Sequence, residues 1–544
     1  MRVQRVALIV TWLVRRYGLG LMRDLAAVAT SVALILLFVH TQAHMPAPSS
    51  RSPVICGNPA ILGGGPVTPP GGAVTVPAGD DSGVNFSLAS TTYWFAPGTH
   101  TLGTGAFSQI NPGSGSTFTG APGAVIDGKQ TNLYAFVGGS TDVTITYLTI
   151  QNFGTWGSDQ NEGVVNHDSG VGWVFEYNTI RDNAGAGLFL GSGDSASYNC
   201  LKDNQQYGFQ VYSAAGPSGV TIDHNEIDHN DTYDWETVQP GCGCTGGGKF
   251  WDAYDVTVTS NYVHDNLSTG LWADTDNSGF DFENNYISGN WGPGIIYEIS
   301  YNALINDNTF VDNAWGSGNA GTGFPSSAVY ISESGFDSRA PNAFGYTAMD
   351  VTNNSFTDNW GGVVLWENAN RYCSSSANTS TGYCTLVNPT VATLTTCANA
   401  TDLAMTPYID DCRWKTQNVT VSGNVFNFTP SVIGSGCNPT PGFCGFNGVF
   451  SESGTYPPYT GQFVENNITY NQNNVFSGNV YNGPWLYMSH ELGSAPLPWP
   501  MWQAPPSSQD AGSILNSSPP PPARGGWPGP AQPPVTVPNR AGRR

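Results

Sequence analysis

A six-residue pattern recurs through the middle of the chain: two asparagines separated by four residues, with an apolar residue third. Successive copies begin 21, 26, 36, 24, 23 and 46 residues apart. We interpret 22–24 residues as one structural unit, so the longer steps contain insertions, around 240–247 in the first and around 317–326 and 335–344 in the second. The copies begin at Asn178, Asn199, Asn225, Asn261, Asn285, Asn308 and Asn354.

Each unit contains short segments in which apolar and polar residues alternate, as in 279–290. Alternation of this kind predicts strands with one buried face, and no helical period accompanies it. A unit of this length cannot bury its apolar face alone, so it must stack on its neighbours. The sequence therefore predicts an all-β parallel β-helix over 90–480. The first asparagine of each copy, from Asn178 to Asn308, is expected at the same turn of successive coils, bonding to the coil above.

This repeat resembles that of right-handed parallel β-helix proteins over 90–480. That family uses its fold mainly on extracellular carbohydrates, which the resemblance implies as a broad expectation for this chain.

Function should come from side chains that point out of the coil, in the strand that follows each asparagine pair. In 270–274 the small or aliphatic Leu271 and Ala273 alternate with Trp272 and Asp274, so the latter two are predicted to face outward. The same count in 294–298 places Glu298 outward. Asp274 and Glu298 are 24 residues apart, which is one coil.

Carboxylates on adjacent strands are expected at roughly 5 Å, because neighbouring strands lie about 4.8 Å apart. A retaining glycosidase needs about 5–5.5 Å between its two carboxyl groups, whereas an inverting one needs about 6.5–9.5 Å. Such proximity separates the two pKa values, so that one group can stay protonated as an acid. The spacing therefore predicts Asp274 and Glu298 as the carboxylate pair of a retaining glycosidase, without assigning the role of each.

Further side chains are predicted to bind substrate around this pair. Lys249, one coil earlier, would bond a sugar hydroxyl or Asp274, and Trp272 would stack on a sugar ring. Asp276 shares the alternation of Asp274 and is the alternative nucleophile. Glu367 and Asp252 are expected to extend the acidic row. The predicted substrate-binding set is Lys249, Trp251, Trp272, Asp276 and Glu367, with no metal site and no cofactor.

The segments Gly270-Leu-Trp-Ala-Asp274 and Ile295-Ile-Tyr-Glu298 resemble the catalytic region of glycoside hydrolase family 120. The resemblance covers 247–310. Those enzymes are retaining β-helix proteins typified by β-xylosidases, with an Asp nucleophile and a Glu acid/base one coil apart. It implies the same roles for Asp274 and Glu298, but the cysteine-rich 370–445 and the proline-rich end depart from that family, which puts substrate identity in doubt.

Two other functions use the same fold. A polysaccharide lyase or uronate epimerase would employ Lys249 as a base, with Ca²⁺ on Asp252, Asp274 and Asp276. Scarce arginine argues against it, since an anionic polymer needs cationic subsites. A non-catalytic carbohydrate-binding protein is equally compatible with the repeat alone.

Charge excludes another class of partner. The chain of 544 residues carries a formal charge of -22. Between Pro53 and Pro496 it has eight basic residues, too few for a face that binds nucleic acid. We expect a monomer that binds carbohydrate.

The chain ends and the cysteines indicate secretion. Basic residues followed by the apolar run 25–39 are typical of a signal peptide, predicted as 1–43, although an uncleaved membrane anchor is the alternative. A linker or cap is expected over 44–89, and a proline-rich disordered tail over 495–544. Ten cysteines favour disulfides in an extracellular protein. Within a cysteine-rich insertion at 370–445, the simplest pairs are Cys373–Cys384, Cys397–Cys412 and Cys437–Cys444.

Overall fold

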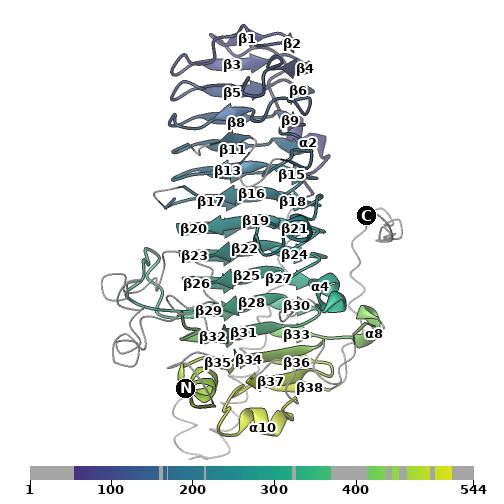
Figure 1. The fold of residues 1–544 in the computed structure, drawn as a ribbon, viewed down its shortest axis with the longest axis vertical. Coiled ribbons are helices and arrows are strands. Elements are labelled where there is room, and N and C mark those ends of the chain that lie inside the picture. Colours follow the sequence, from purple (N-terminus) through teal and green to yellow (C-terminus); the bar gives the residue numbers. More distant parts are fainter. Residues whose placement is uncertain are drawn as a thin grey trace, which may run out of the picture. The chain divides into compact units, whose positions relative to one another are not determined.

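The computed structural model describes residues 54–517, apart from 159–162, 164, 168–169, 214–215, 322–325, 369–413, 435, 438–443, 453–461 and 491–495. Within these residues the chain coils, and successive coils add strands to three long parallel sheets, the third of which begins at β13 (Leu188–Leu190) (Figure 1). The fold is a right-handed parallel β-helix, as predicted.

The sheets are named here by their position in each coil, and every pairing within them is parallel. Sheet 1 consists of β1 (Val74–Val76), β3 (Thr92–Phe95), β5 (Thr117–Gly120), β8 (Thr144–Thr146), β11 (Val174–Glu176), β14 (Ser195–Ser197), β17 (Thr221–Asp223), β20 (Tyr254–Thr259), β23 (Ser278–Glu283), β26 (Tyr301–Asn306), β29 (Met349–Thr352), β32 (Val419–Ser422) and β35 (Val475–Ser477). Sheet 2 consists of β2 (Gly79–Asp80), β4 (Gly98–Thr101), β6 (Ala124–Asp127), β9 (Thr149–Gln151), β12 (Thr179–Arg181), β15 (Cys200–Lys202), β18 (Glu226–Asp228), β21 (Tyr262–His264), β24 (Tyr286–Ser288), β27 (Thr309–Val311), β30 (Ser355–Thr357), β33 (Val425–Asn427), β36 (Val480–Asn482) and β38 (Ile514–Asn516).

Sheet 3 is shorter and carries the predicted site. It consists of β13 (Leu188–Leu190), β16 (Tyr207–Val211), β19 (Gly246–Trp251), β22 (Leu271–Asp274), β25 (Ile295–Glu298), β28 (Val329–Ser332), β31 (Val363–Asn368), β34 (Phe446–Glu452) and β37 (Leu486–His490). A separate pair is formed by β7 (Phe136–Val137) and β10 (Asn166–His167). The helices are short: α2 (Pro59–Leu62), α3 (Trp235–Val238), α4 (Trp315–Ala320), α8 (Pro430–Ile433), α9 (Gln462–Asn471) and α10 (Trp499–Gln503).

Two asparagine ladders hold the turns on either side of sheet 2. The first contains the predicted stack: Asn178 Nδ2 donates to Asn199 Oδ1 at 3.0 Å, and the same bond repeats through Asn308 to Asn354. A second ladder runs from Asn183 to Asn359. Each amide also bonds backbone groups of neighbouring coils, so these buried polar groups are satisfied.

The residue before each ladder asparagine adopts the left-handed backbone conformation that makes the turn. Tyr177 before the first ladder and Asp182 before the second have φ of 58° and 56°. Asp, Asn, His and Gly tolerate this left-handed conformation best, and they dominate the position before the second ladder. The sharp turns thus follow from local chemistry.

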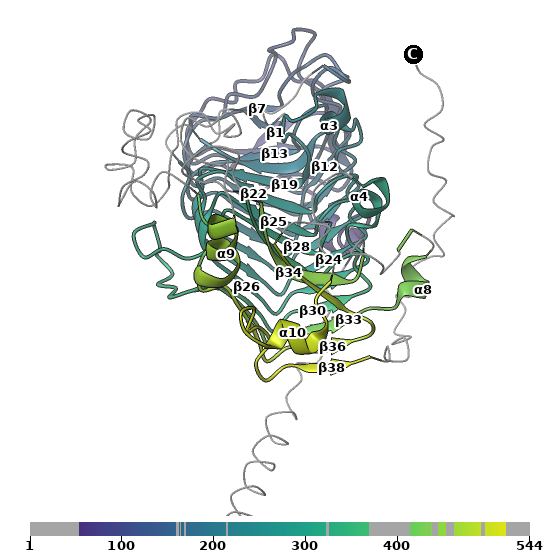
Figure 2. The same ribbon diagram turned by 60° about the horizontal axis from the view of Figure 1, so that its bottom comes forward.

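Inward side chains fill the coil from one layer to the next. Phe310, Phe356, Phe426 and Tyr481 form a continuous stack, with ring centroids 4.9, 4.5 and 4.8 Å apart. At the C-terminal end α10 packs against β37, and the buried Trp502 ring lies 5.6 Å from that of Tyr487 (Figure 2). The helix closes the end of the core that a last open coil would expose.

The coils extend beyond the predicted limits of 90 and 480. β1 lies in the predicted linker, while α10 and β38 lie in the predicted tail, of which 518–544 is outside the described residues. Part of the predicted cysteine-rich insertion is also coil, because β32 and β33 are regular members of sheets 1 and 2. The alternation of apolar and polar residues in β32 and β33 was not recognised in the sequence because cysteines lie on both sides of it.

Three disulfides lie in the described residues. Cys437–Cys444 confirms one predicted pair, and Cys242–Cys244 confirms that these cysteines are disulfide-bonded. The third, Cys56–Cys200, fastens the segment before β1 to sheet 2. The predicted pairs Cys373–Cys384 and Cys397–Cys412, and the predicted signal peptide 1–43, lie outside the described residues. Within the described part of the chain, no helix is long and apolar enough to cross a membrane.

Candidate active site

The predicted carboxylates lie side by side on the outer face of sheet 3. Asp274 ends β22 and Glu298 ends β25, and the two residues are direct partners in the parallel register. Trp251 occupies the same column on β19, one coil before Asp274. Ala273 and Tyr297 directly precede Asp274 and Glu298 in their strands, and both are completely buried. The predicted alternation is therefore correct for β22 and β25.

The two carboxylates differ in exposure. The Asp274 side chain is 21% exposed, whereas Glu298 is 7% exposed despite pointing out of the coil. Glu298 was expected to face solvent, and the structure corrects this: it lies on the outer face but is covered.

Asp274 is fixed by two donors. Lys249 Nζ lies 2.8 Å from Oδ2, and the Thr275 hydroxyl donates to Oδ1 at 2.9 Å. Lys249 is opposite Trp272 in the register, so its ammonium reaches Asp274 diagonally. This resolves the register of Lys249, which the neighbouring insertion obscured in the sequence. The pair leaves Asp274 as an oriented anion with further lone pairs available.

Trp272 connects the cation with the second carboxylate. Lys249 Nζ lies 3.4 Å from the centroid of the Trp272 ring, and Trp272 Nε1 donates to Glu298 Oε2 at 3.2 Å. One face of this indole is therefore occupied by the ammonium. The prediction that Trp272 is the main stacking platform needs this correction, since only its other face remains for a sugar.

Trp251 is the more open aromatic at the site. Its side chain is 44% exposed, and the 37% exposed Tyr212 lies with its ring centroid 6.1 Å away. Tyr212 was missed; it directly follows β16, just as Trp251 follows Phe250, the register partner of Val211. Together they offer an aromatic surface one to two coils before Asp274.

A disulfide-bonded loop lies beside Lys249 and Asp274. Gly243 stands between Cys242 and Cys244, at φ +59°. A Cβ on Gly243 would lie 3.6 Å from Lys249 Nζ and 3.8 Å from Asp274 Oδ2. Glu236 holds this loop by accepting the Gly243 N–H at 3.1 Å. The loop belongs to the insertion that the 36-residue step indicated.

Asp276 does not point outward. It is 1% exposed, follows β22 with φ 60°, and neither carboxylate oxygen has a hydrogen-bond partner among the described residues. Burial, with the nearby charges of Asp252 and Asp274, raises the pKa of Asp276 to about 8. The strand ends at Asp274, so the alternation that suggested Asp276 as an alternative nucleophile stops before it.

Glu367 does not join the acidic row. Register pairs Glu298 with Ser332, and Ser332 with Trp366, so the column passes one residue before Glu367. Glu367 is completely buried and accepts the Thr416 N–H at 2.8 Å. The prediction for Glu367 was displaced by one residue relative to the true register, and a shift of one residue reverses the face of a strand.

Asp252 also lies outside the row, because Trp251 occupies its expected place. Its Oδ1 accepts from the Tyr254 hydroxyl at 2.7 Å. Among the described residues, the groups with metal-ligand spacing lie on sheet 2 and do not include Asp252, Asp274 or Asp276. The Ca²⁺ arrangement considered for a lyase therefore has no counterpart in these side chains.

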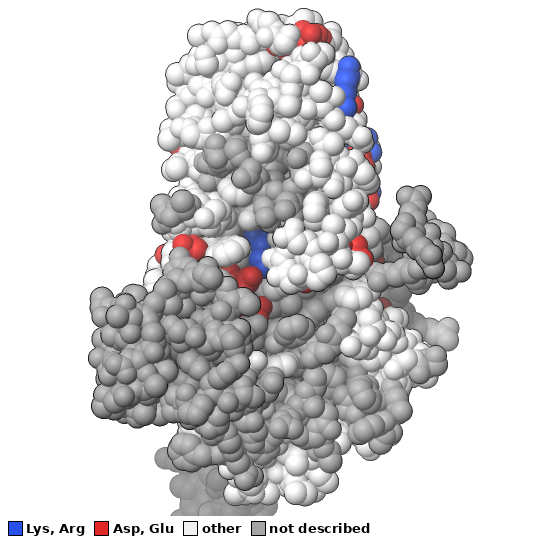
Figure 3. All heavy atoms as spheres, in the orientation of Figure 1, with Lys and Arg blue, Asp and Glu red and all other residues white. Residues whose placement is uncertain are grey.

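Figure 3 shows basic and acidic side chains together in a hollow of an otherwise mostly uncharged face. On sheet 3 a group of charged side chains is formed by Lys249, Asp274 and Glu298, while the other outward residues of this sheet are mostly apolar or neutral. Figure 3 shows further basic and acidic side chains along one edge of the same view.

Comparisons with known proteins address the fold. A family model described as "Right handed beta helix region" matches residues 162–337. No curated protein matches the sequence.

Similar solved structures include enzymes that act on carbohydrates. The A-module of mannuronan C-5 epimerase AlgE4 from Azotobacter vinelandii is 11% identical, over 83% of this chain and 90% of that chain, with a TM-score of 0.43. The catalytic unit of a GH87 alpha-1,3-glucanase from Streptomyces thermodiastaticus is 14% identical, over 83% and 69%, with a TM-score of 0.46. XylC in complex with xylose is 13% identical, over 66% and 54%, with a TM-score of 0.38. None of these likenesses assigns a reaction to this chain.

Proposed function

We propose that this protein is a secreted, monomeric retaining glycoside hydrolase that acts on an oligo- or polysaccharide. The observation that carries the proposal is the direct register of Asp274 with Glu298 on adjacent strands. Strand spacing of about 4.8 Å supports the short carboxyl separation of a double-displacement mechanism.

Asp274 would attack the anomeric carbon. Lys249 and Thr275 each donate to one of its oxygens, so the carboxylate is held in one orientation as an anion. Attack forms the bond between a carboxylate oxygen and the anomeric carbon, while the bond to the leaving oxygen breaks. The ammonium of Lys249 stays in place to bind the aspartate released when water cleaves the intermediate.

Glu298 would supply the proton to the leaving oxygen. An indole N–H is only a donor, so Glu298 Oε2, which receives the Trp272 N–H, must be an acceptor. In the neutral acid the carbonyl oxygen is the better acceptor, which favours Oε2 as the carbonyl and Oε1 as the oxygen that carries the catalytic proton. After the leaving group departs, the same oxygen takes a proton from the attacking water.

The surroundings suggest where the sugar lies. Trp251 presents an exposed ring in the column of the two carboxylates, and sugar rings stack well on such faces. Gly243 closes the space beside Lys249. The bound sugar would thus lie between Trp251 and Glu298, below the disulfide loop.

A lyase or epimerase is less well supported by the same side chains. Those reactions need a cation facing the carboxylate of a uronate. Lys249 is 2% exposed and already paired with Asp274.

A leaving-group series tests the proposal. With a panel of aryl glycosides that includes xylosides, Glu298→Gln should reduce kcat/KM about 100-fold or more for poor leaving groups and little for activated ones, since the latter need no protonation. Glu283→Gln is the matched control, because Glu283 also ends a strand and accepts an amide N–H at 3.1 Å. Sugar binding without turnover by the wild-type protein would favour the binding-protein alternative, and equal losses for all leaving groups would remove the acid/base role.

A further inference from the structure

A second cluster of ionisable side chains lies on sheet 2, away from the strands of the candidate active site. β18 ends at Asp228 and is followed by His229, while β21 ends at His264 and is followed by Asp265. Asp228 and His264 are direct partners in the register. The turns after these strands therefore bring two histidines and two carboxylates together on neighbouring coils.

The distances within this cluster are those of a ligand set. His264 Nδ1 lies 2.8 Å from Asp265 Oδ2 and 3.4 Å from Asp228 Oδ1. His229 Nδ1 also contacts Asp228 Oδ1. One ligand atom from each of Asp228, His264 and Asp265 lies within 4.8 Å of the others. Two ligand atoms of a tetrahedral Zn²⁺, each about 2.0–2.1 Å from the ion, are roughly 3.3 Å apart. The two His264 contacts, at 2.8 and 3.4 Å, lie on either side of this separation.

We propose that Asp228, His264 and Asp265 bind a divalent transition-metal ion, with His229 as the fourth ligand. Imidazole nitrogen combined with carboxylate oxygen suits Zn²⁺, Ni²⁺ or Cu²⁺ better than Ca²⁺ or Mg²⁺, which prefer oxygen alone. His264 and Asp228 side chains are each 10% exposed, whereas those of Asp265 and His229 are 34% and 51% exposed. The ion would enter from the solvent side, past the two more exposed ligands.

A neighbouring carboxylate already orients the central histidine. Glu226 Oε1 lies 3.1 Å from His264 Nε2, and the Tyr262 ring stacks on the imidazole with centroids 3.8 Å apart. A carboxylate on the nitrogen that does not bind metal is the usual partner of a metal-bound histidine. Nδ1 is thereby directed toward Asp228 and Asp265.

The cluster carries more acidic than basic groups. Glu226, Asp228 and Asp265 face His264, while Lys202 lies 3.9 Å from Asp228 and 3.1 Å from Asp203. Burial alone would lower the pKa of His264, but its hydrogen bonds to Asp265 and Glu226 outweigh this and raise the pKa to about 9. The carboxylates that stabilise the charged imidazole would also favour a cation at this position.

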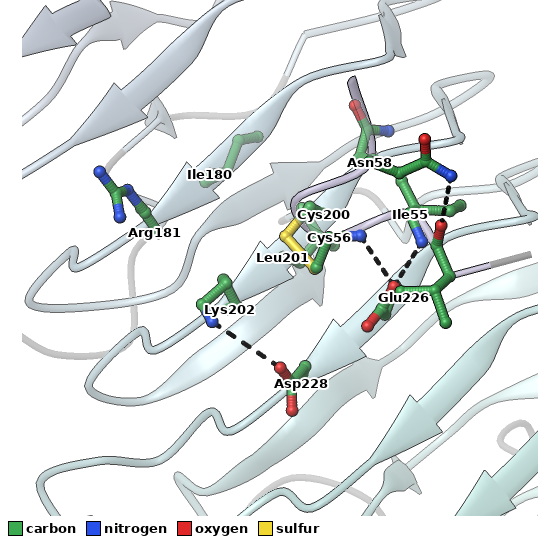
Figure 4. Close-up of a disulfide and its surroundings, with 12 residues drawn as sticks. Ile55, Cys56, Asn58, Ile180, Arg181, Cys200, Leu201, Lys202, Glu226 and Asp228 are labelled. Carbon is green, nitrogen blue, oxygen red and sulfur yellow. Dashed lines mark hydrogen bonds and ion pairs between the residues drawn. A yellow bond between two sulfur atoms is a disulfide. The ribbon is translucent and has the colours of Figure 1, made fainter. Parts of the chain in front are cut away.

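The same carboxylate links the cluster to the N-terminal segment. Glu226 Oε2 accepts the backbone N–H groups of Ile55 and Cys56 at 2.5 and 2.8 Å, beside the Cys56–Cys200 disulfide (Figure 4). Figure 4 also shows Asp228 farther along the strand from Glu226. A bound ion would therefore stabilise the part of sheet 2 to which the N-terminal segment is fastened.

Equilibrium dialysis of the tag-free protein against Zn²⁺ tests the site. We expect one tightly bound Zn²⁺ per chain, and His264→Gln should weaken binding at least about tenfold. His224→Gln is the matched control, because His224 Nδ1 pairs with a single carboxylate, Asp223, at 2.7 Å.

If His264→Gln does not fold, Asp265→Asn tests the same ion through a more exposed ligand. Cu²⁺ in place of Zn²⁺ gives an independent signal, because the nitrogen hyperfine splitting in its electron paramagnetic resonance spectrum should change from two coupled histidine nitrogens to one when His264 is replaced. Zn²⁺ uptake that neither His264→Gln nor Asp265→Asn changes, or no uptake at pH 8, would overturn the proposal and leave the cluster as an ion-pair network.

Discussion

The asparagine ladders and the outer face of sheet 3 are built from the same coils but obey opposite rules. Along the first ladder the same residue recurs in each coil, from Asn178 to Asn354, and each amide makes the same bonds. Along the site column the residue changes at every step, from Trp251 to Asp274, Glu298, Ser332 and Trp366. A constant column serves stability, whereas a column that changes identity can place unlike groups about one strand spacing apart.

The largest expected effect lies in the changing column. Asp274→Ala should reduce kcat by about 1,000-fold or more, because it removes the attacking oxygen. The melting temperature should fall as well, because the 2% exposed Lys249 loses its carboxylate partner, so kcat is taken per folded molecule. Azide should restore part of the turnover with an inverted product. Activity within tenfold of wild type would remove Asp274 from the reaction.

The constant column should show the reverse. Asn261 is completely buried; its Oδ1 accepts from Asn225 N and Nδ2 at 2.9 and 3.1 Å. Asn261→Ala leaves these donors and the Ile222 carbonyl without their partner, which should lower the free energy of unfolding by roughly 2–4 kcal/mol. Chemical denaturation measures this. The kcat per folded molecule should stay the same, and a large fall in kcat would break the division between the two columns.

Asp276 sharpens the comparison, because it is two residues from Asp274 but buried. Its pKa is about 8 in the folded chain and near 3.8 when unfolded, so the unfolded state gives up the proton first as pH rises. Stability is therefore lost progressively between pH 4 and pH 8. Asp276→Asn should equal the wild type near pH 4 and exceed it by on the order of 2–3 kcal/mol at pH 8. A stability difference that does not grow with pH would contradict the assigned burial.

The smallest effect is expected at Trp251. Trp251→Ala removes an exposed stacking surface without touching either carboxylate, so KM should rise about tenfold with kcat nearly unchanged. Tyr212→Ala should act in the same direction but more weakly, since Tyr212 lies farther along the coils. Steady-state kinetics on one oligosaccharide substrate separates the two constants. An unchanged KM in both variants would place the sugar elsewhere.

The fold and the asparagine ladder could be predicted from sequence because both depend on repeated local rules. The adjacency of Asp274 and Glu298 could be predicted for the same reason, since their strands share one alternation and no insertion separates them. Glu367 was misplaced because one residue of alignment error reverses a strand's face. Asp276 was misplaced because the strand ends at Asp274, and sequence alternation does not show where a strand ends.

The residues that the sequence did not reveal are brought together only in the folded chain. Gly243 reaches the site from an insertion, and its disulfide-bonded neighbours give no spacing signal that points to Lys249. The His264 cluster joins two turns that are 36 residues apart, across the same insertion. His229 lies in a turn with φ 51° and His264 ends β21, and neither position distinguishes these histidines in the sequence.

The stereochemistry of hydrolysis tests the central claim most directly. Proton nuclear magnetic resonance during the first minutes of wild-type turnover distinguishes the two anomers of the released sugar before they equilibrate. The register of Asp274 with Glu298 predicts that the first product has the same anomeric configuration as the substrate. An inverted first product would show that water attacks directly, and would contradict the assignment of Asp274 as a covalent nucleophile.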